Sequence, residues 1–184
     1  GSSMRTYVEL MIFDFDGTLV TTGEDIANSV NYTLQSLNLP TFEKEKIRTF
    51  IGDGVVKLIE RAVGQEGKAF QEKALEIFSC HYETHMLDHA ALYPGVHEIL
   101  QHFKEKRKII LTNKRFLYTE KIASALNILN YFEDIIADDS TPFIKPDPML
   151  VKMILERYPV RKEKTVIIGD GVNDVLLAKK AGIV

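Results

Sequence analysis

The sequence predicts an α/β protein, in which a Rossmann-like parallel sheet core carries an inserted small all-helical unit. Four short apolar runs rich in β-branched residues are typical of buried strands. The last three runs alternate with segments of helical periodicity, which indicates a parallel sheet with helices on its faces. About ninety-five residues separate the first run from the second, although a helical crossover needs only ~10–12, so an extra unit is inserted there.

The candidate strands of the core are short, as buried parallel strands usually are. They are residues 8–13, 108–111, 134–137 and 165–168. Apolar residues at helical spacing predict a helix in each interval between the last three strands. These residues are Phe116, Ile122, Ala123 and Leu126 in the first helix, and Leu150, Val151, Ile154 and Leu155 in the second. A further helix, which carries Val175, Leu176 and Ala178, follows the last strand.

The inserted segment, residues 22–92, is expected to be wholly helical. Two apolar stripes run through it at helical spacing. They are Ile26, Val30, Leu34 and Leu37, and then Phe70, Ala74, Phe78, Tyr82 and Met86. Pro94 and Gly95 close the insertion before a returning helix. That helix is expected to bury Val96, Ile99, Leu100 and Phe103. The expected division is a core formed by residues 4–20 and 93–184, with a helical domain at residues 21–92.

The composition excludes several classes of protein. In 184 residues, 45% are hydrophobic and 27% are charged, which fits a chain that folds around its own core. A net charge of −3 offers no general attraction for nucleic acid or for an anionic membrane. The single cysteine, Cys80, cannot form an internal disulfide, and no apolar run reaches the ~20 residues that cross a bilayer. We expect a cytoplasmic protein without nucleic-acid or membrane partners, either a monomer or a homodimer.

Four carboxylates follow two of the candidate strands. Asp14 and Asp16 come after the first strand, and Asp170 and Asp174 come after the fourth. Because the carboxyl ends of parallel strands meet at one edge of a sheet, these side chains should converge on one crevice. Carboxylates held close together repel each other unless a cation neutralises them, and carboxylate oxygens are ligands that Mg²⁺ prefers. The sequence therefore predicts a magnesium site.

The other two strands are followed by groups that bind phosphate. Thr112 and Asn113 end the second strand and offer a hydroxyl and backbone N–H groups. Lys145 follows the third strand and places a positive charge on a loop stiffened by proline. Carboxylates, Mg²⁺, a hydroxyl and a lysine together form a phosphoryl site. The expected ligand is a small phosphorylated metabolite.

In this order the four motifs resemble the haloacid dehalogenase (HAD) superfamily over residues 8–184, and the inserted helices resemble its small helical cap. Within that superfamily the sequence is most similar to phosphoglycolate phosphatases. The segments that carry the resemblance are residues 14–19 (DFDGTL), 48–54 (RTFIGDG), 93–96 (YPGV), 112–114 (TNK) and 145–148 (KPDP). The resemblance implies a phosphatase that hydrolyses a small phosphomonoester, with 2-phosphoglycolate as the first candidate.

The same resemblance implies a role for each aspartate. Asp14 would be the nucleophile that forms an aspartyl-phosphate, and Asp16 would be the general acid and base. Mg²⁺ would be held by the Asp14 carboxylate, the backbone carbonyl of Asp16 and the Asp170 carboxylate. Asp174 would be a direct or a water-bridged ligand.

The remaining roles that the resemblance implies concern the substrate. Thr112 and the Asn113 amide would hold the phosphoryl oxygens, and Lys145 would offset the negative charge between nucleophile and phosphoryl group. The cap loop would close over the substrate, exclude water and select the leaving group. The residues of this loop that are assigned to the substrate are Arg48, Gly52 and Gly54.

Other interpretations of single motifs stay open. Residues 14–17 could begin a calcium loop, but their glycine stands at the fourth position rather than the sixth. Residues 169–174 would also suit an acidic helix N-terminus, and Arg48 could pair with acidic residues of the cap instead of touching substrate. A set of histidines at i, i+4 and i+8 could form either a zinc-binding face or the boundary of a buried face. These histidines are His81, His85 and His89.

The reaction is better constrained than the substrate. A pyrophosphatase, a nucleotidase or a sugar-phosphate mutase of the same fold would share these motifs, and a non-catalytic binding protein could keep the fold without activity. Two features depart from the phosphoglycolate phosphatase pattern. Gly171 stands where serine is usual, and the chain stops at Val184, just where Gly182 should begin a further strand. The sheet is therefore expected to lack its last core strand, as in a truncated chain.

Overall fold

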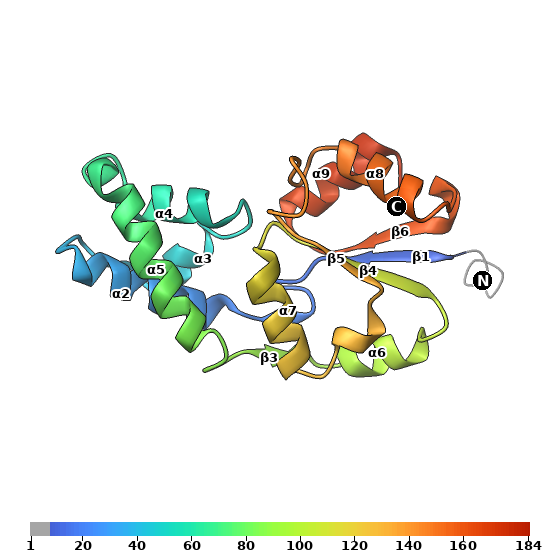
Figure 1. The fold of residues 1–184 in the computed structure, drawn as a ribbon, viewed down its shortest axis with the longest axis horizontal. Helices are drawn as coiled ribbons and strands as arrows, with labels where there is room; N and C mark the ends of the chain where they lie inside the picture. The colour runs from blue at the N-terminus through green and yellow to red at the C-terminus, as the bar shows by residue number, and fades with distance from the viewer. Residues whose placement is uncertain (1–7) are drawn as a thin grey trace.

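The computed structural model describes residues 8–184, so the beginning of the expected core segment, residues 4–7, lies outside the described residues. Figure 1 shows a helical unit beside a sheet unit that carries helices on both faces. The carboxyl ends of the sheet strands face the helical unit. Between residues 8 and 184, no helix combines the length and the apolar character that crossing a membrane requires.

The sheet has four parallel strands in the order β5-β4-β1-β6. Their bounds are Leu10–Phe13 for β1, Arg107–Leu111 for β4, Asp134–Ile136 for β5 and Thr165–Ile168 for β6. All four predicted strands are therefore present, although β1 begins two residues later than expected. Phe13 pairs with Ile110 on one side and with Ile168 on the other, so the ends of β1, β4 and β6 are aligned.

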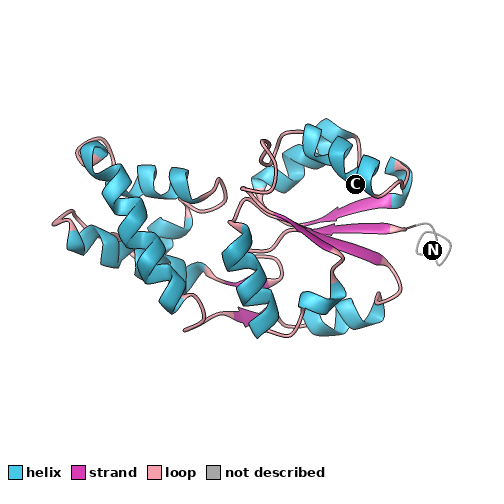
Figure 2. Cartoon of the chain, viewed as in Figure 1, coloured by secondary structure: helices cyan, strands magenta, loops and turns pink. Residues whose placement is uncertain are grey.

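Alternating side chains of the strands face two separate cores. On one face, Met11 and Phe13 pack with buried residues of α6 (Val96–His102) and α7 (Phe116–Ala125). On the other face, Leu10 and Ile12 pack with buried residues of α8 (Met149–Arg157) and α9 (Val172–Ala181). Figure 2 shows these helices above and below the strands. Burial on both faces explains why the strands read as continuous apolar runs.

The helical unit consists of α2 (Gly23–Ser36), α3 (Lys44–Arg48), α4 (Val55–Val63), the 3-10 helix η1 (Lys68–Phe70) and α5 (Gln71–His85). α5 packs against α2 and α4 through the predicted stripe of Ala74, Phe78 and Tyr82. Phe70 was expected in this stripe, but it ends η1 and is 44% exposed. A change of helix type at Gln71 breaks the i, i+4 spacing, so Phe70 does not share the buried face.

The prediction that residues 22–92 are wholly helical is wrong at their end. Ala91–Leu92 form the strand β3, which pairs antiparallel with β2 (Val20–Thr21). This two-stranded ribbon carries the chain from the sheet unit into the helical unit and back. The expected division at residues 20/21 and 92/93 falls within or beside this ribbon.

The returning helix buries fewer residues than predicted. Val96 and Leu100 are buried, whereas Ile99 is 49% exposed. α6 has only seven residues, and its i, i+4 pair Val96 and Leu100 faces the sheet. Ile99 lies on another side of the helix and points to solvent. On α9 the buried apolar residues are Leu177 and Ala181, while Val175 and Leu176 are exposed.

The end of the chain lies beside β6, where a further strand was expected. Gly182 closes α9 in the left-handed region with φ of 70°, a common helix ending for glycine. The chain then turns back, and the Ile167 N–H donates to the Val184 carbonyl at 2.7 Å. Within the described residues, β6 remains the edge strand of the four-stranded sheet.

Candidate active site

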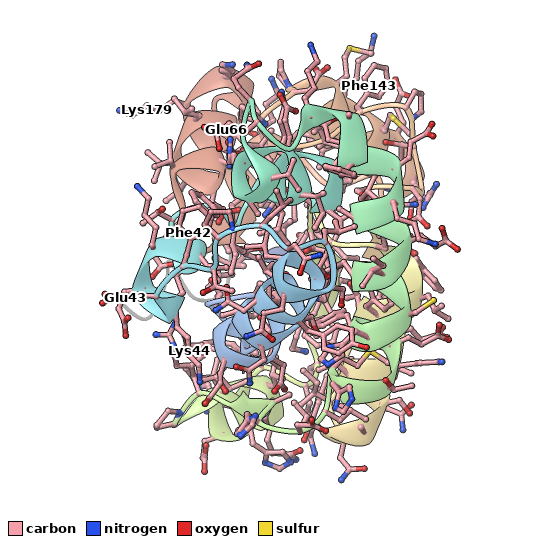
Figure 3. The ribbon with its side chains drawn as sticks, turned by 90° about the vertical axis from the view of Figure 1, so that its left-hand side faces the viewer. Phe42, Glu43, Lys44, Glu66, Phe143 and Lys179 are labelled. Atoms are coloured by element: carbon pink, nitrogen blue, oxygen red, sulfur yellow. The ribbon has the colours of Figure 1, made fainter. Side chains whose placement is uncertain are left out.

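A cavity of about 670 Å³ lies between the carboxyl ends of the strands and the helical unit. Figure 3 looks at the molecule from the side of the helical unit, with α2 to α5 in front of the sheet. Phe42, Glu43 and Lys44, labelled there, lie at the start of α3 and do not line the cavity. The candidate site residues do line it: Asp14, Asp16, Arg48, Gly52, Gly54, Thr112, Asn113, Lys145, Asp170 and Asp174.

Lys145 joins two of the predicted carboxylates. Its Nζ donates to Asp14 Oδ1 at 2.9 Å and to Asp174 Oδ1 at 2.8 Å. The lysine and Asp174 side chains are 4% and 3% exposed. Asp14 is also fixed by its own neighbour, because the Phe15 N–H donates to Asp14 Oδ1 at 2.8 Å. The end of β1, the loop after β5 and the first turn of the helix α9 thus converge on one ion-pair network.

Burial dominates the electrostatics of Asp14. Burial raises the pKa of its carboxyl, the Lys145 ammonium lowers it, and the nearby Asp174 carboxylate raises it again, giving a pKa of about 7. One ammonium therefore faces two carboxylates, which leaves an excess of negative charge in a poorly hydrated site.

Asp16 lies two residues beyond Asp14 and has different partners. The Thr22 hydroxyl donates to Asp16 Oδ1 at 2.5 Å, and Lys114 Nζ lies 3.2 Å from the same oxygen. The chain turns sharply after Asp16 because Gly17 adopts a φ of 81°, a conformation that favours glycine. The Asp16 carboxylate is thus held by Thr22 and Lys114 rather than by Lys145.

Lys114 was not assigned a role from the sequence. Its side chain is only 7% exposed, and its Nζ also donates to the Tyr82 hydroxyl of α5 at 2.7 Å. Burial acts to lower the pKa of Lys114, but Asp16 and Tyr82 outweigh it and the pKa is raised. For the Tyr82 hydroxyl the effect of burial has the opposite sign, and it raises the pKa of Tyr82 to about 12. The signal available in the sequence was the position of Lys114, directly after two candidate phosphate-binding residues.

Thr112 and Asn113 differ in how their side chains are used. The Thr112 hydroxyl accepts the Lys114 N–H at 3.1 Å and lines the cavity. The Asn113 side chain accepts the Lys145 N–H at 2.9 Å and donates to the carbonyls of Lys145 and Gly52 at 3.1 and 2.9 Å. The side-chain amide of Asn113 therefore holds the lysine loop against the helical unit and is already engaged in these hydrogen bonds.

The loop after α3 contacts the sheet unit directly. Asn173 of α9 donates to the Gly52 carbonyl at 3.0 Å and to Asp53 Oδ1 at 2.8 Å. Gly54 adopts a φ of 91°, and a Cβ built on it would lie 3.4 Å from the Asn113 carbonyl. Gly54 thus allows a close approach of backbone to backbone, whereas Gly52 has open space around it and takes a φ of 126° that favours glycine.

Arg48 is exposed and lines the cavity from the helical unit. Its side chain packs over Gly23, where an added Cβ would lie 3.1 Å from Arg48 Nε. Within residues 8–184 it has no ion pair within 4.0 Å. Arg48 therefore remains available to an anionic group in the cavity.

The carboxylates around Gly169 offer oxygen atoms of the kind that a hard cation prefers. Residues 8–184 contain no group of three His, Cys, Asp or Glu side chains already gathered at metal-ligand distances, and Lys145 lies between Asp14 and Asp174. A Cβ built on Gly169 would lie 2.5 Å from Asp174 Oδ2 and 3.0 Å from Asp14 Cβ, so only glycine leaves the two aspartates this close. Asp170 is exposed at the rim of the same cavity. Oxygen ligands with excess negative charge fit Mg²⁺.

The three histidines have separate partners rather than a common centre. His81 Nδ1 contacts the Ser29 hydroxyl at 2.7 Å and His85 Nδ1 contacts Asp88 at 2.7 Å. His89, which follows α5, contacts the buried Asp25 carboxylate at 2.7 Å. Since these contacts use a different partner for each ring, the boundary-face interpretation describes them better than a zinc site.

Comparison with known proteins gives a consistent result. Residues 11–184 match the family described as haloacid dehalogenase-like hydrolase. A phosphoglycolate phosphatase from Colwellia psychrerythraea is 38% identical over 95% of this chain and 81% of its own length. One from Haemophilus influenzae (strain 86-028NP) is 33% identical over 97% of this chain and 84% of its own. A solved structure from Haemophilus somnus 129pt, described as a predicted phosphoglycolate phosphatase, superposes with a TM-score of 0.90 at 28% identity. That superposition covers 96% of this chain and 83% of the solved one.

Proposed function

Because this chain belongs to the haloacid dehalogenase-like hydrolase family and is a phosphatase similar to phosphoglycolate phosphatases, we propose that it hydrolyses a small phosphomonoester through an aspartyl-phosphate, with Mg²⁺ as cofactor. One observation carries the proposal. Asp14 is held by Lys145 at the end of β1, while Asp16, two residues on, faces the same cavity with separate partners. Two carboxylates in different surroundings suit two different roles in one reaction.

Asp14 is the proposed nucleophile. The Phe15 N–H and the Lys145 ammonium fix its Oδ1, which leaves Oδ2 to attack phosphorus. Attack breaks the bond between phosphorus and the leaving oxygen and forms the bond to Asp14. Lys145 then offsets the charge that builds up between the carboxylate and the phosphoryl group.

Asp16 is the proposed general acid and base. It would donate a proton to the leaving oxygen and then take a proton from the water that hydrolyses the aspartyl-phosphate. The Thr22 hydroxyl and the Lys114 ammonium hold one of its oxygens, so the other oxygen is available for this proton.

Phosphoryl oxygens would be bound by the Thr112 hydroxyl, the Asn113 backbone N–H and Lys145. The carboxylates of Asp14, Asp170 and Asp174, together with the Asp16 carbonyl, would hold Mg²⁺. When bound, Mg²⁺ supplies positive charge to the phosphoryl group. The small space that Gly169 leaves between Asp14 and Asp174 supports this assignment.

The proposed substrate is a small phosphorylated metabolite with a second anionic group, and 2-phosphoglycolate is the first candidate. Arg48 supports it, because this exposed guanidinium lines the cavity from the helical unit, opposite the aspartates. Gly52 and Gly54 would complete this side of the substrate site by holding the loop against the sheet unit. The proposed setting is the cytoplasm, which the single cysteine of the sequence favours.

Phosphate release from a panel of substrates tests this proposal. The panel contains 2-phosphoglycolate, pyrophosphate, sugar phosphates and nucleotides, each with and without Mg²⁺. We expect release that requires Mg²⁺, is highest for 2-phosphoglycolate, and is abolished in Asp14→Asn. Binding of Mg²⁺ to the unreacted protein is measured separately by calorimetry. If the protein prefers another compound of the panel, that compound takes the place of 2-phosphoglycolate as the proposed substrate. If the folded protein releases no phosphate from any of them, the proposed activity is contradicted.

A further inference from the structure

Lys114 is a buried cation that joins the helical unit to one catalytic carboxylate. It stands in the loop after β4, with a side chain only 7% exposed. Its Nζ lies 3.2 Å from Asp16 Oδ1, donates to Tyr82 Oη at 2.7 Å and lies 4.6 Å from the centre of the Tyr82 ring. An ammonium removed from water needs such partners, since losing one leaves a buried charge poorly compensated.

Tyr82 is itself held firmly between the two units. It is 1% exposed on α5, and its ring stacks on Phe78 with centroids 5.4 Å apart. On the other side its ring meets the edge of Tyr118 of α7 at 5.1 Å. Displacement of α5 from α7 would therefore carry the Tyr82 hydroxyl away from Lys114.

The contacts of Asp16 also lie where the helical unit meets the sheet unit. Thr22, at the beginning of α2, and Lys114 both contact Oδ1. Without Lys114, the Asp16 carboxylate would keep its hydrogen bond from Thr22 but would lose the ammonium that fixes its direction. Lys114 thus connects the direction of Asp16 with the position of α5.

We propose that Lys114 is a positioning residue that orients the Asp16 carboxylate toward the leaving oxygen. Tyr82 holds the Lys114 ammonium in the position that this orientation requires when α5 lies against the sheet unit. The inference rests on the proposed function, in which Asp16 protonates the leaving group. Both residues line the cavity, but the Lys114 ammonium contacts Asp16 and the Tyr82 hydroxyl rather than Asp14, so in this role they act through Asp16. The helical unit would then complete the general acid as well as enclose the substrate.

Leaving-group dependence separates this role from a purely structural one. An alkyl ester needs its leaving oxygen protonated, whereas p-nitrophenolate leaves without a proton. The quantity to compare is kcat/KM, which reports the steps up to formation of the aspartyl-phosphate. A misdirected Asp16 should therefore lower kcat/KM for the alkyl ester far more than for p-nitrophenyl phosphate.

The experiment measures kcat/KM of Lys114→Met and Tyr82→Phe on 2-phosphoglycolate, or the alkyl phosphate that the wild type prefers, and on p-nitrophenyl phosphate. We expect Lys114→Met to lose ~100-fold on the alkyl ester and less than ~3-fold on the aryl ester. Tyr82→Phe keeps the ring and removes only the hydroxyl, so we expect a loss of ~10-fold confined to the alkyl ester. Lys114→Arg restores the charge and should recover part of the activity.

Lys121→Met is the matched control. Lys121 of α7 lies 3.6 Å from Glu83 of α5, so like Lys114 it links α5 to the sheet unit, but both partners in this ion pair are exposed and neither is Asp16. We expect unchanged kcat/KM on both esters. Thermal unfolding of each variant shows whether it is folded, and Tyr82→Phe serves as the test if Lys114→Met does not fold.

Each remaining outcome would overturn the inference. Equal losses on the two esters would show that Lys114 only supports the fold, and an unchanged alkyl-ester rate would show that Asp16 needs no such help. In both cases the wild type still hydrolyses phosphate esters, so the proposed function stands. If the wild type hydrolyses neither ester, the proposed function fails and the inference fails with it.

Discussion

The two sides of the cavity hold their charged groups in different ways. On the sheet side, Lys145 and Asp174 are buried and Asp14 is partly buried, and both aspartates pair with the lysine. On the helical side, Arg48 is exposed, and the ion pair of Asp53 with Arg61 is more than one-third exposed on both partners. The buried groups are oriented before any substrate arrives, whereas the exposed groups can change with little loss of stability. This difference is consistent with the proposal that the nucleophile acts from the sheet side and that the helical side selects the substrate.

The largest effect should come from the nucleophile on the sheet side. Asp14→Asn removes the attacking oxygen but keeps an acceptor for Lys145, so we expect phosphate release to fall by ~10⁴-fold or more. The free energy of unfolding should change by less than about 2 kcal/mol. Steady-state phosphate release and urea unfolding measure the two quantities. Substantial activity in Asp14→Asn would show that Asp14 on the sheet side is not the nucleophile.

The next effect concerns stability. Lys145→Met leaves the buried Asp174 and the partly buried Asp14 without their shared cation, so we expect the free energy of unfolding to fall by about 3–5 kcal/mol in a buffer with chelator. Urea unfolding measures it. The exposed pair offers a control, because Arg61→Met should cost less than about 1 kcal/mol. Similar losses in both variants would show that the two sides do not differ in this way.

A smaller effect should follow a change on the helical side. Arg48→Ala removes a charged contact with the second anionic group, so KM for 2-phosphoglycolate should rise ~10-fold while kcat stays within ~3-fold. Lys46→Ala is the control, since Lys46 is an exposed cation of α3 that does not line the cavity. Initial-rate kinetics on both variants decide the matter. A fall in kcat with unchanged KM would place Arg48 in the reaction rather than in binding.

The smallest effect is a pH dependence of stability. The hydrogen bond with Asp25 raises the pKa of the exposed His89, so the folded protein holds this proton more tightly than the unfolded chain. The contribution is complete below the ordinary histidine pKa of about 6.5 and is lost as pH rises through the raised value. The stability difference between wild type and His89→Gln should therefore be larger at about pH 5.5 than at about pH 9. A constant difference in urea unfolding would contradict this contact.

The sheet and its aspartates could be predicted because they depend on local signals. Buried parallel strands produce apolar runs, and their carboxyl ends meet, which brings Asp14, Lys145 and Asp174 together from distant parts of the chain. The contact of Lys114 with Tyr82 could not be predicted, because it depends on how α5 packs against the sheet unit. Tyr82 carries the spacing of a core residue, and its hydroxyl leaves no trace in the apolar pattern.

The ribbon was missed for a related reason. β2 and β3 have two residues each, too few for an alternating pattern, and their pairing joins positions about seventy residues apart. The exposure of Ile99 depends on how α6 lies on the sheet, and a short helix leaves this undetermined in sequence. Element types were therefore predictable where periodicity is long, and contacts between units were not.

The ribbon also determines how freely the inserted segment can vary. The Thr21 hydroxyl donates to the Ala91 carbonyl and accepts the Ala91 N–H, both at 3.2 Å, so the two ends of the insertion are fastened side by side. The entropy of closing a loop grows only with the logarithm of its length, and doubling the length costs roughly 0.6 kcal/mol. Insertions and deletions in the loops between Thr21 and Ala91 should consequently disturb the sheet little, provided that they keep the contacts of Thr22, Gly52 and Tyr82 with the sheet unit.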